Sequence, residues 1–166
     1  MKMDNTTLVQ MISWRDGYGE NFFHQVCRAG SFQLLERIQP YMTEDLRHLL
    51  EVTNYQGKPC MHVAVSSPSV SIYIMKILRT MGADINSKSN TGGFAVLHEA
   101  VVHKAYAIAE WLCQQPDIQL NAITWGDLTP YQLAYTHNDS KMMDILKKYG
   151  ADTSPPPVSS SEEESN

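Results

Sequence analysis

Apolar residues near the end of this chain form two short runs, each with the period of a helix. The first run, PYQLAYTHN, follows Thr129, a favoured N-cap residue, and starts with Pro130. Proline suits a first helical turn because the N–H that it lacks would have no intrahelical partner there. A helix of two turns is not stable alone in water, so this run needs a neighbour to pack against.

The second run predicts another helix, with Ser140 as its N-cap and Gly150 as the residue after its C-cap. Its apolar residues fall at positions i, i+1, i+3 and i+4 and form one stripe. They are Met142, Met143, Ile145 and Leu146. Two short helices, each with one face to bury, predict a helix–turn–helix unit that is stable only beside further copies of itself.

The same order of signals occurs four times along the chain. A histidine after an apolar residue marks three copies, and a glutamine marks the fourth. These positions are His24, His62, His98 and Gln132, at separations of 38, 36 and 34 residues. The copies cover about 19–53, 54–89, 90–123 and 124–153. A period of this length predicts a linear stack of repeats, preceded by an N-terminal segment or cap over residues 1–18.

This unit resembles the ankyrin repeat. The resemblance rests on LTPYQLAY in the fourth copy, VLHEAV in the third and IMKILRTMGADIN in the second, and it extends over about 19–152. It implies an all-α fold: an ankyrin-repeat solenoid of about four helix-turn-helix repeats with short β-hairpin fingers. Asn21, Pro59 and Ala95 stand where the pattern has threonine, and Thr43 with two following acidic residues predicts an extra or extended helix.

Composition narrows the class of protein. The net charge of −5 gives no attraction for a phosphate backbone, so we expect no direct binding to nucleic acid. No apolar run approaches the roughly 18 residues that span a bilayer, and the N-terminus does not resemble a secretory signal. We therefore expect a cytoplasmic or nuclear protein. Residues 153–166 are rich in Pro, Ser and Glu and predict a short disordered acidic tail.

Histidine and cysteine residues offer the one constellation with possible chemistry. Cys-x-His and His-x-x-Cys spacings occur among His24, Cys27, Cys60 and His62, with His98 and Cys113 further along. A metal site or a Cys–His catalytic pair is the alternative that this set leaves open, and a zinc assay would test it. The three histidines occupy one repeat position, where ankyrin proteins use histidine to hydrogen-bond the turn. We interpret them as structural, the thiols as buried and reduced, and the protein as no enzyme, with no metal or cofactor.

The repeats suggest where a protein partner would bind. Fingertips and the outward faces of the first helices present polar and aromatic side chains to the concave side of such a stack. Trp125 lies near a predicted fingertip, whereas Trp111 falls in a core stripe. The candidate binding residues are Arg28, Asn54, Tyr55, Asn90, Glu99, His103 and Trp125.

Two segments and the tail resemble the inhibitor-of-kappa-B family. TPYQLAY is similar to the Ser-Pro-Tyr-Gln-Leu-Thr-Trp ending of that family, and YGENFFHQV is similar to its opening repeat. The resemblance implies capture of Rel/NF-kappa-B transcription factors by a chain that is a monomer before binding. The alternative is a generic ankyrin-repeat adaptor for another protein.

The residues before Gly19 differ from the cellular inhibitors. They contain one serine, Ser13, and one lysine, Lys2, and no Asp-Ser-Gly-x-x-Ser degradation signal. With four repeats instead of six or seven, the chain resembles the viral inhibitor-of-kappa-B-like proteins of polydnaviruses, which parasitoid wasps carry. That resemblance implies a constitutive inhibitor, located in the host cell, that suppresses the host immune response.

Overall fold

The structure is a computed structural model that describes residues 5–67 and 71–158, and this part of the chain is helical. Its elements are α1 (Asn5–Ser13), α2 (Phe22–Ala29), α3 (Phe32–Ile38), η1 (Gln39–Tyr41), η2 (Glu44–Leu50), α4 (Cys60–Ser66), α5 (Ile72–Met81), α6 (Val96–Val102), α7 (Tyr106–Cys113), α8 (Pro130–Thr136) and α9 (Ser140–Lys148), where η denotes a 3-10 helix. Lys88 and Ala95 form an isolated antiparallel bridge, and the described residues contain no strand. The all-α prediction is confirmed, and of the expected hairpins only this bridge is formed in the described part.

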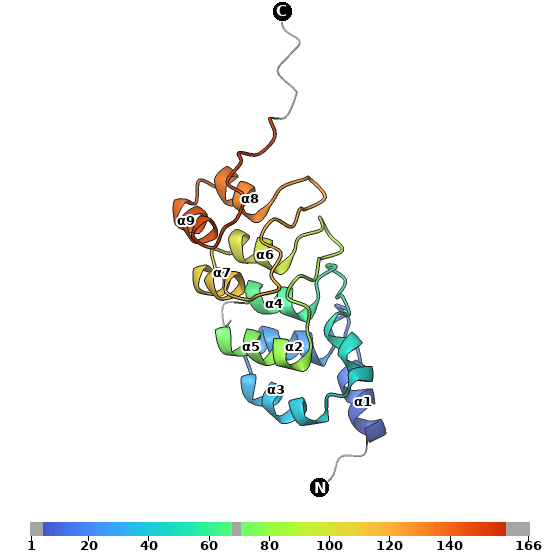
Figure 1. The fold of residues 1–166 in the computed structure, drawn as a ribbon. Coiled ribbons are helices and arrows are strands. Elements are labelled where there is room, and N and C mark those ends of the chain that lie inside the picture. Colours follow the sequence, from blue (N-terminus) through green and yellow to red (C-terminus); the bar gives the residue numbers. More distant parts are fainter. Residues whose placement is uncertain (1–4, 68–70, 159–166) are drawn as a thin grey trace, which may run out of the picture.

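The helices lie in two rows (Figure 1). In the first row α2, α4, α6 and α8 pack one against the next, and in the second row α3, α5, α7 and α9 do the same. Each first-row helix also contacts the second-row helix that follows it in the chain. A single hydrophobic core runs through both rows, from Leu8 to Ala151. Because most of these helices have only seven to ten residues, packing between rows must supply the stability that each helix lacks alone.

The N-terminal end of the stack is closed by two further elements. α1 contacts α2 and η2 and buries Leu8 and Ile12. η2 follows Thr43, where the sequence predicted an extra helix, and it buries Leu50. It is a 3-10 helix, and the side chain of Thr43 makes no capping hydrogen bond. These elements keep water from the core face of the first repeat.

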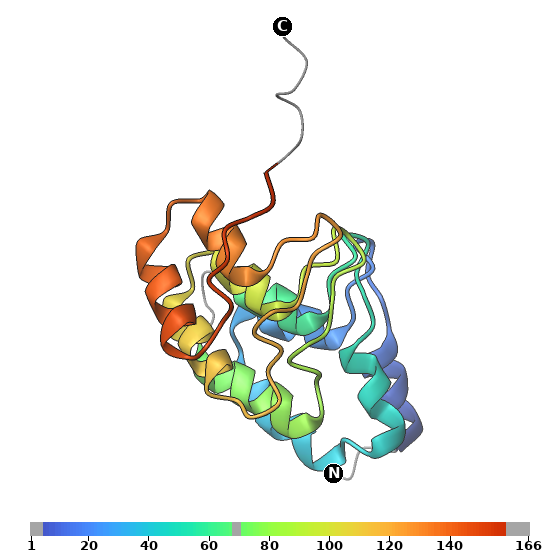
Figure 2. The same ribbon diagram turned by 45° about the horizontal axis from the view of Figure 1, so that its top comes forward.

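Four loops precede the first-row helices and lie side by side (Figure 2). We call them fingers; they comprise residues 16–20, 54–58, 89–94 and 124–128. The side-chain oxygen of the first residue of each finger accepts hydrogen bonds from backbone N–H groups further along the loop, as Asx and Ser/Thr turns do. These first residues are Asp16, Asn54, Ser89 and Thr124. A residue with positive φ then reverses the chain, and Gly57 (φ 73°) and Asp127 (φ 58°) are examples.

Backbone hydrogen bonds join each finger to the one before it. The second residue of a finger donates its N–H to a carbonyl of the preceding finger. The bonds run from Tyr55 to Tyr18 (3.0 Å), from Asn90 to Gly57 (2.7 Å) and from Trp125 to Gly92 (2.9 Å). The side chains of Tyr55, Asn90 and Trp125 therefore occupy equivalent positions on successive fingers.

A buried imidazole connects each first-row helix to the next finger. In all three cases the ring Nε2 lies within hydrogen-bond distance of the carbonyl that precedes the next first-row helix. The pairs are His24 with Lys58 (2.9 Å), His62 with Phe94 (2.9 Å) and His98 with Leu128 (3.0 Å). All three histidines have no exposed surface. Burial lowers the pKa of each of these imidazoles, and it lowers the pKa of His98 to about 4. The structural interpretation of these histidines therefore accounts for their contacts.

The second ring nitrogen completes the same arrangement. Nδ1 of His98 accepts the backbone N–H of Ala95 at 3.1 Å, so Nε2 carries the proton and donates it to Leu128. The equivalent residue before His62 is Pro59, which has no N–H, and Nδ1 of His62 is buried without a partner in the described structure. Proline at this cap therefore leaves one acceptor unsatisfied at the junction between the second and third repeats.

Glutamine makes both bonds in the fourth repeat. Oε1 of Gln132 accepts the N–H of Thr129 at 3.0 Å, and Nε2 donates to the carbonyl of Pro155 at 3.2 Å. Residues 151–158 thus pass the fourth repeat on the path that a further finger would take, and the N–H of Asp152 donates to Oδ1 of Asn121 at 2.9 Å. The rest of the predicted tail, from 159 to 166, lies outside the described residues.

Cap residues agree with the sequence at two helix ends and differ at one. Thr129 caps α8 as predicted, since its hydroxyl oxygen accepts the N–H of Gln132 at 3.2 Å. Gly150 ends α9 as predicted, with φ 93°. The prediction that Ser140 caps α9 is wrong, because the carboxylate of Asp139 accepts the N–H of Met142 at 3.1 Å and Ser140 is the first helical residue. Asp and Ser are both favoured at N-caps, and the two residues are adjacent, so the sequence pattern did not show which of them caps the helix.

Replacing His98 with glutamine tests the imidazole bond through its titration. In the unfolded chain the pKa of His98 is about 6.5, whereas in the folded chain burial lowers it to about 4. The unfolded state therefore binds more protons between these values, and His98 lowers the free energy of unfolding by about 2 kcal/mol when the pH falls from about 7 to about 5. We expect His98→Gln to lose this part of the pH dependence, since Gln132 shows that glutamine makes both bonds.

Urea unfolding of both proteins at the two pH values measures the difference. His137→Gln is the matched control, because it makes the same substitution at an exposed position beyond the end of α8. Equal pH dependence in the wild type and in His98→Gln would contradict the assignment.

Replacing Gly93 with alanine tests how the exposed side chain of Trp125 is held, because this side chain packs against Gly93. Its φ is 66°, and a Cβ atom there would lie 2.5 Å from Cδ1 of Trp125. We expect Gly93→Ala to lower the free energy of unfolding by about 1–2 kcal/mol, since an L-residue is strained in this conformation and the indole must move. Gly126→Ala is the control: φ there is not positive, and the nearest heavy atom to an added Cβ, Oγ1 of Thr124, is 3.8 Å away. Equal denaturant midpoints for the two variants would refute this account.

Candidate protein-binding surface

Exposed aromatic side chains mark one face of the molecule, formed by the fingers and the adjoining surface of the first row. We call this face the inner surface. Tyr18 is 77% exposed, Tyr55 is 76% exposed and Trp125 is 72% exposed. Trp and Tyr are enriched among the residues that contribute most to protein–protein binding. These three rings are exposed to water, whereas other aromatic side chains, such as Phe23 and Trp111, are buried in the hydrophobic core.

Glycines hold two of these rings in place. The Tyr55 ring lies against Gly19, where an added Cβ would be 2.6 Å from the ring, and the Trp125 indole lies against Gly93 in the same way. The guanidinium of Arg15 sits over the Tyr55 ring, 5.7 Å from its centre. Each ring is therefore supported by its own chain although most of it is exposed, which reduces the conformational entropy that it would lose on binding.

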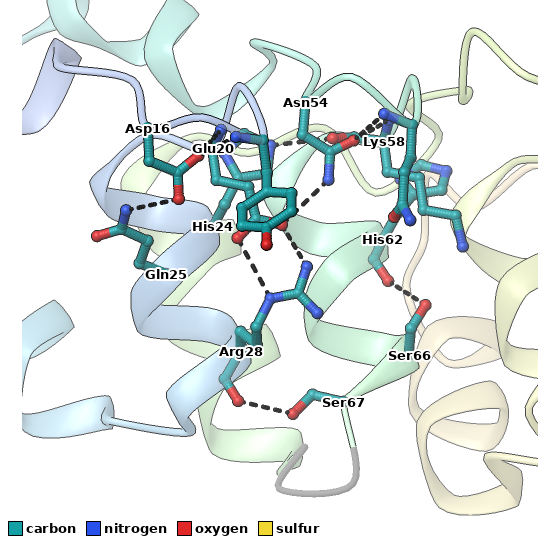
Figure 3. Close-up of polar contacts among 12 residues, drawn as sticks. Asp16, Glu20, His24, Gln25, Arg28, Asn54, Lys58, His62, Ser66 and Ser67 are labelled. Atoms are coloured by element: carbon teal, nitrogen blue, oxygen red, sulfur yellow. Dashed lines mark hydrogen bonds and ion pairs between the residues drawn. The ribbon is translucent and has the colours of Figure 1, made fainter.

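Glu20, Arg28 and Asn54 form the first polar cluster of the inner surface (Figure 3). Arg28 pairs with both carboxylate oxygens of Glu20 through Nε and Nη2, and Nδ2 of Asn54 donates to Oε1 of Glu20 at 3.2 Å. The hydrogen bonds from Arg28 lower the pKa of the Glu20 carboxyl, and the same pair raises the pKa of Arg28. Oδ1 of Asn54 accepts the N–H groups of Gln56 and Lys58. Asn54 is buried, so it fixes its finger and exposes almost nothing to a partner.

Glu99 is the centre of the second polar cluster. Its Oε2 lies 3.1 Å from Nζ of Lys58 and 3.4 Å from Nε2 of His103. Glu99 is buried, whereas His103 is exposed at the end of α6. Lys58 comes from the second finger, which precedes α4, and Glu99 comes from α6, so this cluster also joins two helix pairs. Of the two predicted residues, His103 presents its ring and Glu99 orients it.

Two hollows on the inner surface bring most of the predicted residues together. The first, of about 400 Å³, is lined by Tyr18, Glu20, Arg28, Asn54, Tyr55 and Gln56. The second, of about 680 Å³, includes Tyr55, Gln56, Phe94, Glu99, Val102 and His103. The two hollows adjoin at Tyr55 and Gln56 of the second finger, and we call the pair the groove. Its lining includes Arg28, Asn54, Tyr55, Glu99 and His103. The predicted residues outside these two linings are Asn90 and Trp125, on the third and fourth fingers.

Sequence reasoning missed Tyr18 and Val102. Tyr18 stands in DGYGEN, whose Asp16 and Gly19 match the Asn54 and Gly57 of NYQGKP, so the finger pattern would have placed it beside Tyr55. Val102 is 41% exposed on α6, one residue before His103. Its apolar side chain resembled a core position, and only the packing of the rows shows that it faces the groove.

The histidines and cysteines do not assemble into a reactive site in the described residues. No group of three or more His, Cys, Asp or Glu residues that would hold a metal ion occurs between 5 and 67 or between 71 and 158. Burial raises the pKa of Cys113 to about 11, and the neighbouring thiol of Cys27 with burial raises that of Cys60. Protonated thiols are poor nucleophiles. Over the same ranges, no helix has the length and apolar character to span a bilayer.

Comparisons with known proteins give the family. No family model matches the chain. I-Kappa-B like protein H1 of Microplitis demolitor bracovirus is 40% identical over 148 residues, which cover 89% of this chain and 77% of the relative. I-Kappa-B like protein C2 of the same virus is 41% identical over 138 residues, covering 82% and 76%, and protein N2 is 35% identical over 175 residues, covering 98% and 95%. With this identity over most of both chains, the protein belongs to the family of I-kappa-B like proteins.

Proposed function

We propose that this chain is a protein-binding inhibitor that sequesters host Rel/NF-kappa-B transcription factors and thereby suppresses the immune response. The observation that carries the proposal is the inner surface, where Tyr18, Tyr55 and Trp125 are exposed and the last two pack against glycines of the preceding finger. Family membership supports this class of partner, since the relatives are named I-Kappa-B like proteins. Their origin in a bracovirus supports a viral protein that acts in a host cell, in its cytoplasm or nucleus.

The proposed scaffold is an ankyrin-repeat solenoid of four repeats. Its support is a set of contacts that recurs along the chain. Each finger starts with a turn-forming side chain, the second to fourth fingers each make a backbone bond to the preceding finger, and a His or Gln at one position of every first-row helix bonds to the following segment. Stacked repeats of this kind present long surfaces that suit protein partners. The partner would bind the inner surface of a monomer, with no contact between this chain and DNA.

Alanine at the two glycine-supported rings tests this function. We expect Tyr55→Ala with Trp125→Ala to weaken binding of a purified insect Rel-family dimer at least about 30-fold. Two buried interface aromatics commonly contribute about 2 kcal/mol each, so this is the conservative figure. Biolayer interferometry gives the dissociation constant. Competition with a labelled DNA site shows whether bound dimer is withheld from DNA.

Tyr41→Ala is the matched control, because Tyr41 is 47% exposed on η1, away from the fingers. It should leave affinity within about twofold, as is usual for surface changes outside an interface. A wild-type chain that binds no Rel-family dimer would refute the proposed function. Strong binding by the double variant would refute its placement on these fingers and favour another surface.

A further inference from the structure

We propose that Ser154 is a phosphorylation site for a proline-directed serine kinase, and that the phosphate releases residues 151–158 from the fourth repeat. We call residues 151–158 the strap. In Figure 2 the strap leaves the end of α9 and runs past α8. The site is independent of the partner proposed above. Three features lead to it: the choice that the fold makes among similar sequence pairs, the place of Ser154 in its repeat, and the contacts of its hydroxyl group.

The fold leaves one of the candidate serine and threonine residues open to a kinase. The serine and threonine residues that precede a proline in this chain are Ser67, Thr129 and Ser154. Ser67 is buried, and its hydroxyl donates to the carbonyl of Arg28 at 3.0 Å. Thr129 is the N-cap of α8, and its hydroxyl oxygen accepts the N–H of Gln132, so a kinase could reach it only by unfolding the helix. Ser154 is exposed in a segment that is neither helix nor strand.

The exposure of Ser154 follows from its place in the last repeat. GADTS, which ends at Ser154, matches GADIN, which ends at Asn86. The side chain of Asn86 bonds to the third repeat: Nδ2 donates to the carbonyl of Asp117 at 2.8 Å, and Oδ1 accepts the N–H of Gln119 at 2.8 Å. In the described residues only the strap follows the fourth repeat, so Ser154 stays at the surface. The proline after it favours an extended backbone at Ser154, as protein kinases require of a substrate segment.

The hydroxyl group of Ser154 makes a bond that a phosphate would remove. Oγ donates to Oδ1 of Asp152 at 2.7 Å, and the N–H of Ser154 donates to the same oxygen at 2.9 Å. In the reaction the bond from the γ-phosphorus of ATP to its bridging oxygen breaks and a bond to Oγ forms, while the hydroxyl proton passes to the carboxylate base of the kinase and ADP leaves. Oγ then has no proton to donate, and the phosphate brings about −1.5 to −2 charges beside the Asp152 carboxylate.

The strap is held by two bonds next to this turn. The N–H of Asp152 donates to Oδ1 of Asn121 at 2.9 Å, and the carbonyl of Pro155 accepts from Nε2 of Gln132 at 3.2 Å. Asp152 and Pro155 flank Ser154, so a carboxylate that moves away from the phosphate takes both bonded groups with it. Bonds at such an exposed chain segment open more readily than bonds in a core. Gln132 would then lose the contact that corresponds to the histidine-to-finger bonds of the earlier repeats.

The first experiment locates the phosphate. The full chain is incubated with Mg-ATP and a purified mitogen-activated protein kinase or, separately, a cyclin-dependent kinase, and mass spectrometry identifies the modified residues. We expect phosphate at Ser154, with Ser67 and Thr129 modified at least about tenfold more slowly, since each must wait for local unfolding. Pro155→Ala should abolish the reaction, although it keeps both the serine and the carbonyl that Gln132 binds.

Three results would overturn the site. They are failure of both kinases to modify Ser154, modification of Ser67 or Thr129 at a similar rate, and modification of Ser154 in Pro155→Ala at the wild-type rate.

The second experiment measures release of the strap by NMR. Amide exchange reports on the N–H of Asp152, and the side-chain amide signals of Gln132 report on its bond to Pro155. We expect phosphorylation to speed exchange at Asp152 at least about fivefold, the effect of losing one hydrogen bond, and to shift the Gln132 signals. Ser154→Ala removes the hydroxyl without adding charge, so its effect should lie between those of the unmodified and the phosphorylated chain. Unchanged exchange at Asp152, or unchanged Gln132 signals, in the phosphorylated chain would overturn the release.

Discussion

The hydrogen bond from a buried imidazole to the carbonyl of the next finger determines how each repeat sits on its neighbour. Helices of seven to ten residues have too few internal bonds to persist in water, so the apolar face of each must meet another helix. Hydrophobic packing is not directional, and it would tolerate small shifts between rows. The bonds of His24, His62 and His98 are directional and fully buried, so a shift would leave a polar group unsatisfied at a cost of about 1–3 kcal/mol.

The hydrogen bonds from the buried imidazoles also position the fingers. The carbonyl of Lys58 that accepts from His24 also accepts the N–H of Asn54, which begins the same finger. Asn54 in turn places Tyr55 against Gly19 and shares Glu20 with Arg28. An interaction made for stacking therefore fixes the exposed rings of the inner surface. Affinity for the proposed partner and the stability of the fold depend on some of the same residues in this region. Core substitutions near the fingers will therefore alter both.

Local signals in the sequence predicted the features that local chemistry decides. The cap at Thr129, the ending at Gly150 and the exposure of Trp125 all follow from residues within a short segment of the chain. The burial of Asn54 and Glu99 does not, because their partners Glu20 and Lys58 come from another repeat. The choice of Asp139 over Ser140 and the 3-10 form of η2 likewise depend on packing that no short segment encodes. The fold was therefore easier to predict than the surface, where contacts between repeats decide which polar side chain remains available.

Pro59 weakens one junction of the helix stack, which we call the seam. Because proline withholds the N–H that Nδ1 of His62 would accept, the junction between the second and third repeats carries an unmet acceptor in the described structure. In a linear array, stability is a sum over junctions, and the weakest one is where the rod opens first. The larger hollow straddles this seam, with Tyr55 and Lys58 on one side and Phe94 and Glu99 on the other. A molecule bound in this hollow would contact both sides of the junction, so its binding would stabilise the junction against local unfolding.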